Sequence, residues 1–148
     1  EIYQCDWSSD VCSSDLIFVW TPPHFWALAL WKNINADYGR AGVPMLPVVA
    51  GADETRRQIL IYSLILVPVS FVPNLLGVAG VLYGAAAAAL GVTFLSLALA
   101  VYRRRDGQTG ERALKRLFAF SVLWLFLIFA PILVERLLGL PAIAPVLA

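Results

Sequence analysis

The chain has 148 residues, of which 60% are hydrophobic and 14% are charged, and its mean hydropathy is +0.77. Soluble domains are usually about 45–50% apolar and about 25% charged, so this composition argues against a soluble globular protein. The formal net charge is only +1, and the basic segments lack the interleaved aromatic residues of single-strand nucleic-acid binders. A nucleic-acid partner is therefore not expected.

Residues 1–15 differ from the rest of the chain. They are rich in Ser and Asp, contain the similar strings CDWSSD and CSSD, and lack the basic start, apolar middle and cleavage site of a signal peptide. Cys5 and Cys12 match no zinc or redox spacing. The string resembles a translated sequencing-adapter remnant, so we expect 1–15 to be non-native and 16–148 to be the C-terminal part of one membrane domain. A native, polar, disordered tail is the alternative.

Apolar segments follow one another along the remaining sequence. A helix needs about 20 apolar residues to cross a bilayer, and no charged residue occurs between Ile59 and Tyr102. Asn74 and Gly77 are turn signals that divide this long run. The string 84–91 holds five consecutive alanines, and small residues let membrane helices approach closely. The sequence thus predicts an all-α, polytopic membrane helix bundle with four transmembrane helices, at about 16–31, 57–75, 78–102 and 117–134.

The basic residues predict how these helices are oriented. They are concentrated in the segments 32–57 and 103–116, whereas the turn near Asn74 carries no charge. Because short loops on the cytoplasmic side of a membrane are rich in Lys and Arg, both basic loops are expected to be cytoplasmic and the turn to face the opposite side. Topology anchoring is the simplest role for these basic residues, and binding of a diphosphate is the alternative.

A histidine lies inside the first predicted span. His24 follows Pro22 and Pro23, and helical geometry places it on one face with Trp20 and Trp31. The two prolines free backbone carbonyls and allow a kink. An ionisable group within a membrane helix is a candidate functional residue, although a hydrogen-bonded structural histidine is the alternative.

The loop after this span carries further polar candidates. A carboxylate such as Asp37 suits Mg²⁺, which prefers oxygen ligands and often bridges to substrate phosphates. Lys32 and Arg40 could hold a diphosphate by charge and hydrogen bonding, or could simply anchor the topology. Asp53 and Glu54 suit the start of the next helix, where acidic groups meet the positive end of the helix dipole. The apolar run 45–49 is expected to pack back against the bundle.

The strings PPHFWALAL, DY, AGVPMLPVVAG and TRRQI occur here in an order and spacing that closely resemble the C-terminal half of the protoheme IX farnesyltransferases (haem O synthases). These belong to the UbiA-type intramembrane prenyltransferases. The resemblance covers about residues 17–134 and is most specific over 21–51. It implies a nine-helix membrane bundle of which the four helices here are the last four. It also implies an Asn-Asp-x-x-Asp loop in the N-terminal half, a motif absent from this sequence, so the fragment alone is expected to be inactive.

The resemblance also implies a reaction, in which a farnesyl group passes from farnesyl diphosphate to a vinyl group of haem b and water is added. Mg²⁺ is the implied cofactor and haem b the implied substrate. By the family pattern Lys32, Asp37 and Tyr38 belong to the second polar motif, and His24 contacts haem or handles protons. The expected catalytic residues are His24, Asp37 and Tyr38, and the expected substrate-binding residues are Lys32, Arg40 and Trp31. The expected setting is the bacterial inner membrane, with contact to haem–copper oxidase assembly factors.

Two other functions compete with this one. A sibling prenyltransferase acting on a quinone or chlorophyll precursor would normally show an Asp-x-x-x-Asp pattern, but position 41, four residues after Asp37, is alanine. A transporter or haem-carrying membrane subunit would use His24 as a ligand. Bis-imidazole haem sites need two histidines, and this chain has one.

Overall fold

The structure, a computed structural model, describes residues 7–31, 37, 39–105 and 107–139. Throughout these residues the regular structure is helical, with no strand, as the all-α prediction requires. The helices are α1 (Trp7–Ala29), α3 (Leu46–Val49), α4 (Ala52–Val69), α5 (Val72–Leu75), α6 (Val81–Arg103) and α7 (Gly107–Leu137). Helix α1 includes residues 7–15, and the proposal that 1–15 is non-native stays a prediction.

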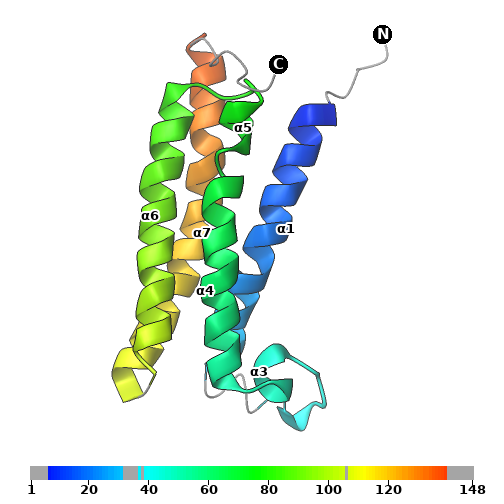
Figure 1. The fold of residues 1–148 in the computed structure, drawn as a ribbon, viewed down its shortest axis with the longest axis vertical. Coiled ribbons are helices and arrows are strands. Elements are labelled where there is room, and N and C mark those ends of the chain that lie inside the picture. Colours follow the sequence, from blue (N-terminus) through cyan, green and yellow to red (C-terminus); the bar gives the residue numbers. More distant parts are fainter. Residues whose placement is uncertain (1–6, 32–36, 38, 106, 140–148) are drawn as a thin grey trace.

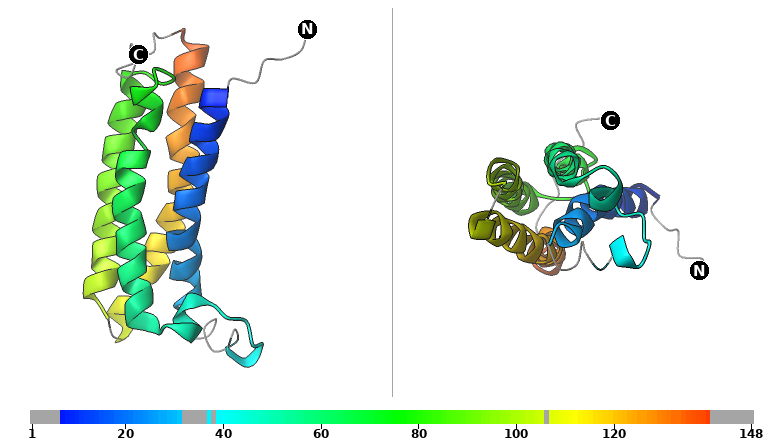
Figure 2. Two further views of the ribbon diagram at one scale, coloured as in Figure 1. Left: turned by 45° about the vertical axis from the view of Figure 1, so that its right-hand side comes forward. Right: turned by 90° about the horizontal axis from the view of Figure 1, so that it is seen from below.

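The four long helices form an elongated bundle in which they run side by side (Figures 1 and 2). Helix α1 packs against α4 and α7, and α6 packs against the same two helices. The short helix α3 and the link between α6 and α7 lie at one end of the bundle, and α5 lies at the other (Figure 1). The two basic segments are therefore at the same end.

Three helical stretches of the described residues are long and apolar enough to cross a membrane: Ala52–Leu75, which covers α4 and α5, and the helices Val81–Arg103 and Gly107–Leu137. This agrees with the predicted polytopic membrane bundle. Helix α1 does not reach the same hydropathy, because it begins with the polar residues 7–15 and carries Pro22, Pro23 and His24 in its second half. That α1 also crosses the membrane stays a prediction.

The segment 103–116 is not the loop that the sequence predicted. Helix α7 begins at Gly107, well before position 117, and α4 begins at Ala52 before position 57. The prediction counted only apolar residues, but both helices continue into polar sequence. In α7 this extension is supported by an ion pair between Glu111 Oε1 and Lys115 Nζ, 2.7 Å apart and one helical turn from each other.

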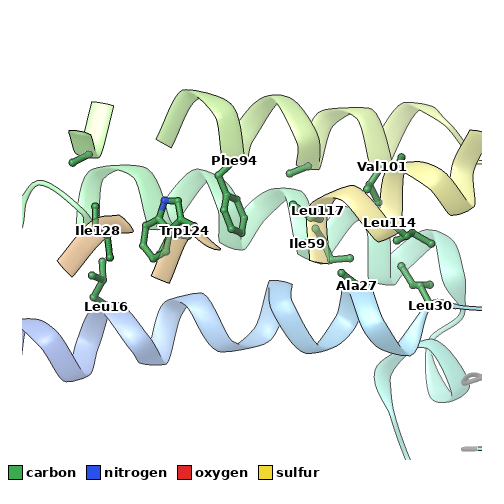
Figure 3. Close-up of a cluster of buried hydrophobic side chains, with 14 of the residues drawn as sticks. Leu16, Ala27, Leu30, Ile59, Phe94, Val101, Leu114, Leu117, Trp124 and Ile128 are labelled. Atoms are coloured by element: carbon green, nitrogen blue, oxygen red, sulfur yellow. The ribbon is translucent and has the colours of Figure 1, made fainter. Parts of the chain in front are cut away.

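Large buried side chains fill the space between the helices (Figure 3). Leu16 and Ile128 lie at one end of the row, and Leu30 and Leu114 at the other. Close packing of this kind contributes many small dispersion contacts, which matter most where lipid replaces water around the helices. The residues labelled in Figure 3 are Leu16, Ala27, Leu30, Ile59, Phe94, Val101, Leu114, Leu117, Trp124 and Ile128.

The small residues of α6 allow a close approach to its neighbours, as expected for the run 84–91. A Cβ atom on Gly91 would lie 3.4 Å from Cγ2 of Val67 on α4, and one on Gly84 would lie 3.3 Å from Nδ2 of Asn74. Ala87 between them is fully buried.

The prediction that the apolar run 45–49 packs back against the bundle was wrong in part. In α3 Pro47 is buried, but Val49 is 71% exposed, because so short a helix turns only one side to the bundle.

Candidate active site

His24 lies between two aromatic rings at the contact of α1 with α7. Its ring stacks on Trp20 from its own helix, with centroids 4.4 Å apart, and on Phe118 from α7, with centroids 4.7 Å apart. Phe25 approaches edge-on at 5.5 Å. Both faces of the imidazole are therefore covered, and only its edges are left for hydrogen bonding or chemistry.

Ser121 on α7 is the hydrogen-bonding partner of this aromatic group. His24 Nδ1 lies 2.7 Å from Ser121 Oγ, and Trp20 Nε1 donates to the Ser121 carbonyl oxygen at 2.9 Å. The Ser121 hydroxyl in turn donates to the carbonyl oxygen of Phe118 at 2.7 Å. Two polar groups of α1 are thus satisfied by a single residue of α7. Sequence reasoning missed Ser121 and Phe118, although their i, i+3 spacing places them on one face of a helix.

Trp31 continues the aromatic surface toward the end of the bundle that carries the basic segments. Its ring meets Phe118 edge-on with centroids 5.7 Å apart, and Lys115 Nζ lies 5.7 Å from the Trp31 ring centre. That distance permits a cation–π attraction. Trp31 Nε1 is buried and has no hydrogen-bond partner within the described part of the chain. The structure thus joins His24, Phe118 and Trp31 into one surface, with a cation at its polar end.

The structure does not bring the described polar loop residues to His24. Asp37 and Arg40 pair with each other at 3.8 Å, and their side chains are 74% and 82% exposed. Lys32 and Tyr38 lie outside the described residues. Among the described residues no group of three or more His, Cys, Asp or Glu side chains could hold a metal ion. Asp37 is thus one exposed carboxylate beside Arg40, and a single carboxylate suits a Mg²⁺ ion that is held mainly by substrate phosphates.

The acidic residues at the start of α4 have local partners. Asp53 and Glu54 lie in the first turn, where the helix dipole favours them. Arg56 Nη1 lies 3.0 Å from Asp53 Oδ1, and its Nη2 donates to the carbonyl oxygen of Arg105 at 2.8 Å. Arg57 lies 3.6 Å from Glu54. The Arg56 contacts join α4 to the link between α6 and α7.

These features define a polytopic membrane protein with an aromatic, histidine-containing site beside a basic end. The chain belongs to the UbiA prenyltransferase family, whose profile matches residues 13–127.

Curated relatives agree with this family. A "Protoheme IX farnesyltransferase" of Parvibaculum lavamentivorans is 57% identical over 133 residues, which are 90% of this chain and 41% of that protein. Proteins of the same name from Azorhizobium caulinodans and from Rhodopseudomonas palustris strain CGA009 are 57% and 58% identical, over 82% and 81% of this chain and 39% and 38% of theirs. The chain thus spans about two fifths of these relatives. No solved structure matches it.

Proposed function

We propose that the full-length protein containing this chain transfers a farnesyl group from farnesyl diphosphate to a vinyl group of haem b, with addition of water, to give haem O. The observation that carries the proposal is the identity of 57–58% to relatives named for farnesyl transfer to protoheme. The aromatic surface of His24, Phe118 and Trp31 supports it, because an allylic cation needs a dry, electron-rich wall.

The first step breaks the bond between C1 of the farnesyl group and the diphosphate oxygen. Negative charge then gathers on the leaving group, so cationic side chains aimed at it stabilise the transition state. Lys32 and Arg40 are proposed to take this role, and Tyr38 belongs to the same polar motif. When bound, Mg²⁺ neutralises diphosphate charge, and Asp37 is its proposed ligand in this chain.

The second step uses the haem vinyl group as the nucleophile. Its terminal carbon bonds to C1 of the farnesyl group, which leaves positive charge on the inner vinyl carbon. Water adds there and must lose a proton. His24 is proposed to contact the haem side of the site, either at the porphyrin or as the group that takes this proton.

The proposed setting is the inner membrane of a bacterium, with both basic segments cytoplasmic. Arg56 supports placing them on one side, since it joins α4 to the α6–α7 link. Contact with haem–copper oxidase assembly factors is part of the same proposal, since haem O must be delivered to a protein.

Full-length enzyme in membranes, supplied with haem b, farnesyl diphosphate and Mg²⁺, tests the activity. The expected product is haem O, and residues 1–148 alone should make none, because they lack the first metal-binding loop. Parallel reactions receive a quinone precursor in place of haem b. Prenylation of the quinone without haem O would assign the protein to a sibling activity. Tight haem binding with no prenyl product from either acceptor would favour a haem carrier.

A further inference from the structure

We propose that Ser121 is a positioning residue for His24. It holds the neutral imidazole as the Nδ1–H tautomer, so that the lone pair lies on Nε2, where it takes the proton from the water that adds to the substrate. This inference rests on the proposed function and assigns the working atom of the histidine.

The tautomer follows from the number of protons available. A serine hydroxyl has one proton and can accept through its lone pairs. Ser121 Oγ has two short contacts, each of 2.7 Å, to Nδ1 of His24 and to the carbonyl oxygen of Phe118. A carbonyl oxygen only accepts, so the hydroxyl proton must point to Phe118. Nδ1 must then supply the proton of the other bond. In the opposite tautomer the Ser121 hydroxyl would have to donate to Nδ1. Ser121 Oγ and the carbonyl oxygen of Phe118 would then lie 2.7 Å apart with no proton between them.

The ring is also held in orientation. Trp20 and Phe118 cover its two faces at centroid distances of 4.4 and 4.7 Å, with interplanar angles of 20° and 23°. Trp20 is itself tied to α7 by its hydrogen bond to the Ser121 carbonyl. Within the described residues only Nδ1 of the imidazole is hydrogen-bonded, and the ring is half-buried. Nε2 is therefore the nitrogen left for an incoming group.

The chemistry of the second step balances with this assignment. As the bond from C1 to diphosphate breaks, C1 bonds to the terminal vinyl carbon and the inner vinyl carbon becomes cationic. The water oxygen bonds to that carbon, and one water proton passes to Nε2. The resulting imidazolium keeps its Nδ1–H bond to Ser121, which becomes stronger because its donor is now charged. Ser121 thus supports the charged form of His24 as well as the orientation of its neutral form.

Ser63 offers a matched control for Ser121. It is also a fully buried serine in the middle of a long helix, and its hydroxyl donates to the carbonyl oxygen of Ile59 at 2.6 Å. Ser63→Ala therefore removes the same atom from a similar setting without touching the imidazole. Ser121→Thr keeps a hydroxyl at the site and serves as the conservative variant.

The test uses full-length enzyme labelled with ¹⁵N-histidine in lipid nanodiscs. Nitrogen chemical shifts report which imidazole nitrogen carries the proton, and His24→Gln identifies the signal of His24. The proton should lie on Nδ1 in the wild type and in Ser63→Ala, and should be shared between the nitrogens in Ser121→Ala. Turnover in Ser121→Ala should fall about tenfold, the factor expected for loss of one hydrogen bond to a charged group. Its KM for farnesyl diphosphate should not change, and Ser121→Thr should recover the tautomer and most of the rate.

A wild-type signal from the Nε2–H tautomer would overturn the inference, even if His24 proved essential. So would a Ser121→Ala enzyme with the kcat and the nitrogen shifts of Ser63→Ala. A different result tests the underlying function: if His24→Gln makes haem O at the wild-type rate, the proposed proton transfer through His24 is wrong whatever its tautomer.

Discussion

The carboxylate of Glu135 on α7 caps the helix in which Tyr83 lies. Its Oε1 accepts a hydrogen bond from the backbone N–H of Tyr83 at 2.9 Å, and its Oε2 accepts one from Gly80 at 2.7 Å. The N-cap of α6 has no side-chain hydrogen bond of its own, so Glu135 supplies acceptors to N–H groups in the first turn of this helix. A residue near the end of α7 thus supplies the hydrogen-bond acceptors for the N-terminus of α6.

We predict that Glu135→Ala destabilises the bundle. It would remove the carboxylate that accepts two buried backbone hydrogen bonds, at a cost of about 1–3 kcal/mol, and with it a negative charge at the positive end of a helix. The measurement is the free energy of unfolding in mixed micelles. Glu135→Gln retains an acceptor and should lose less. The neighbouring Arg136 is exposed, so Arg136→Ala is the control; equal stability of the two alanine variants would contradict the capping role.

A larger residue at position 91 should separate α4 from α6. A Cβ atom there would already lie 3.4 Å from Val67, so Gly91→Leu must displace one helix, which typically costs about 1–3 kcal/mol. Ala89 on the same helix is exposed, and Ala89→Leu adds similar bulk toward lipid. Thermal unfolding of the two variants in the same detergent gives the comparison. The packing assignment fails if Gly91→Leu melts at or above the temperature of Ala89→Leu.

In the full-length enzyme, Asp37→Ala should lower kcat by about a hundredfold, as expected when one contact to a developing charge is lost. The side chain is 74% exposed, so the folded bundle should be unaffected. Raised Mg²⁺ should restore part of the rate if the carboxylate binds the metal. Asp53→Ala removes an exposed carboxylate at the start of α4, which contacts Arg56 and Arg105 and lies outside the proposed site, and should change kcat little. Wild-type kinetics for Asp37→Ala would remove this residue from the site.

The topology predicts that labels at Gln108 and Leu76 react from opposite sides of the membrane. Both positions are exposed. Gln108 lies in the first turn of α7 and Leu76 directly follows α5, and α5 lies at the end of the bundle opposite to the link between α6 and α7 (Figure 1). Single cysteines there, in a cysteine-free background, are treated with a membrane-impermeant maleimide on intact cells and on inverted vesicles. Gln108→Cys should react only in inverted vesicles and Leu76→Cys only in intact cells. The reverse pattern would place the basic segments outside the cytoplasm.

Sequence pattern predicted the class of fold because a helix in lipid must be apolar over about 20 residues, and the uncharged run from Ile59 to Tyr102 is long enough for two such helices. The start of α7 at Gly107 was not predictable from hydropathy, since its first turns are polar and helical. The pairing of His24 with Ser121 was not predictable either. It depends on α1 and α7 being neighbours, and the two residues are 97 positions apart. His24 itself could be singled out, because a lone ionisable group in an apolar helix is costly.

The partners of Trp20 and His24 lie on the last of the long helices, 101 and 97 residues further along the chain. A ribosome delivers the N-terminal parts first, so α1, α4 and α6 are synthesised before Ser121 exists. During that interval the imidazole and the indole N–H of α1 must be satisfied by water, lipid headgroups or another protein. The histidine site can therefore form only after α7 has been made, and a chain truncated before α7 lacks the Ser121 partner of its imidazole.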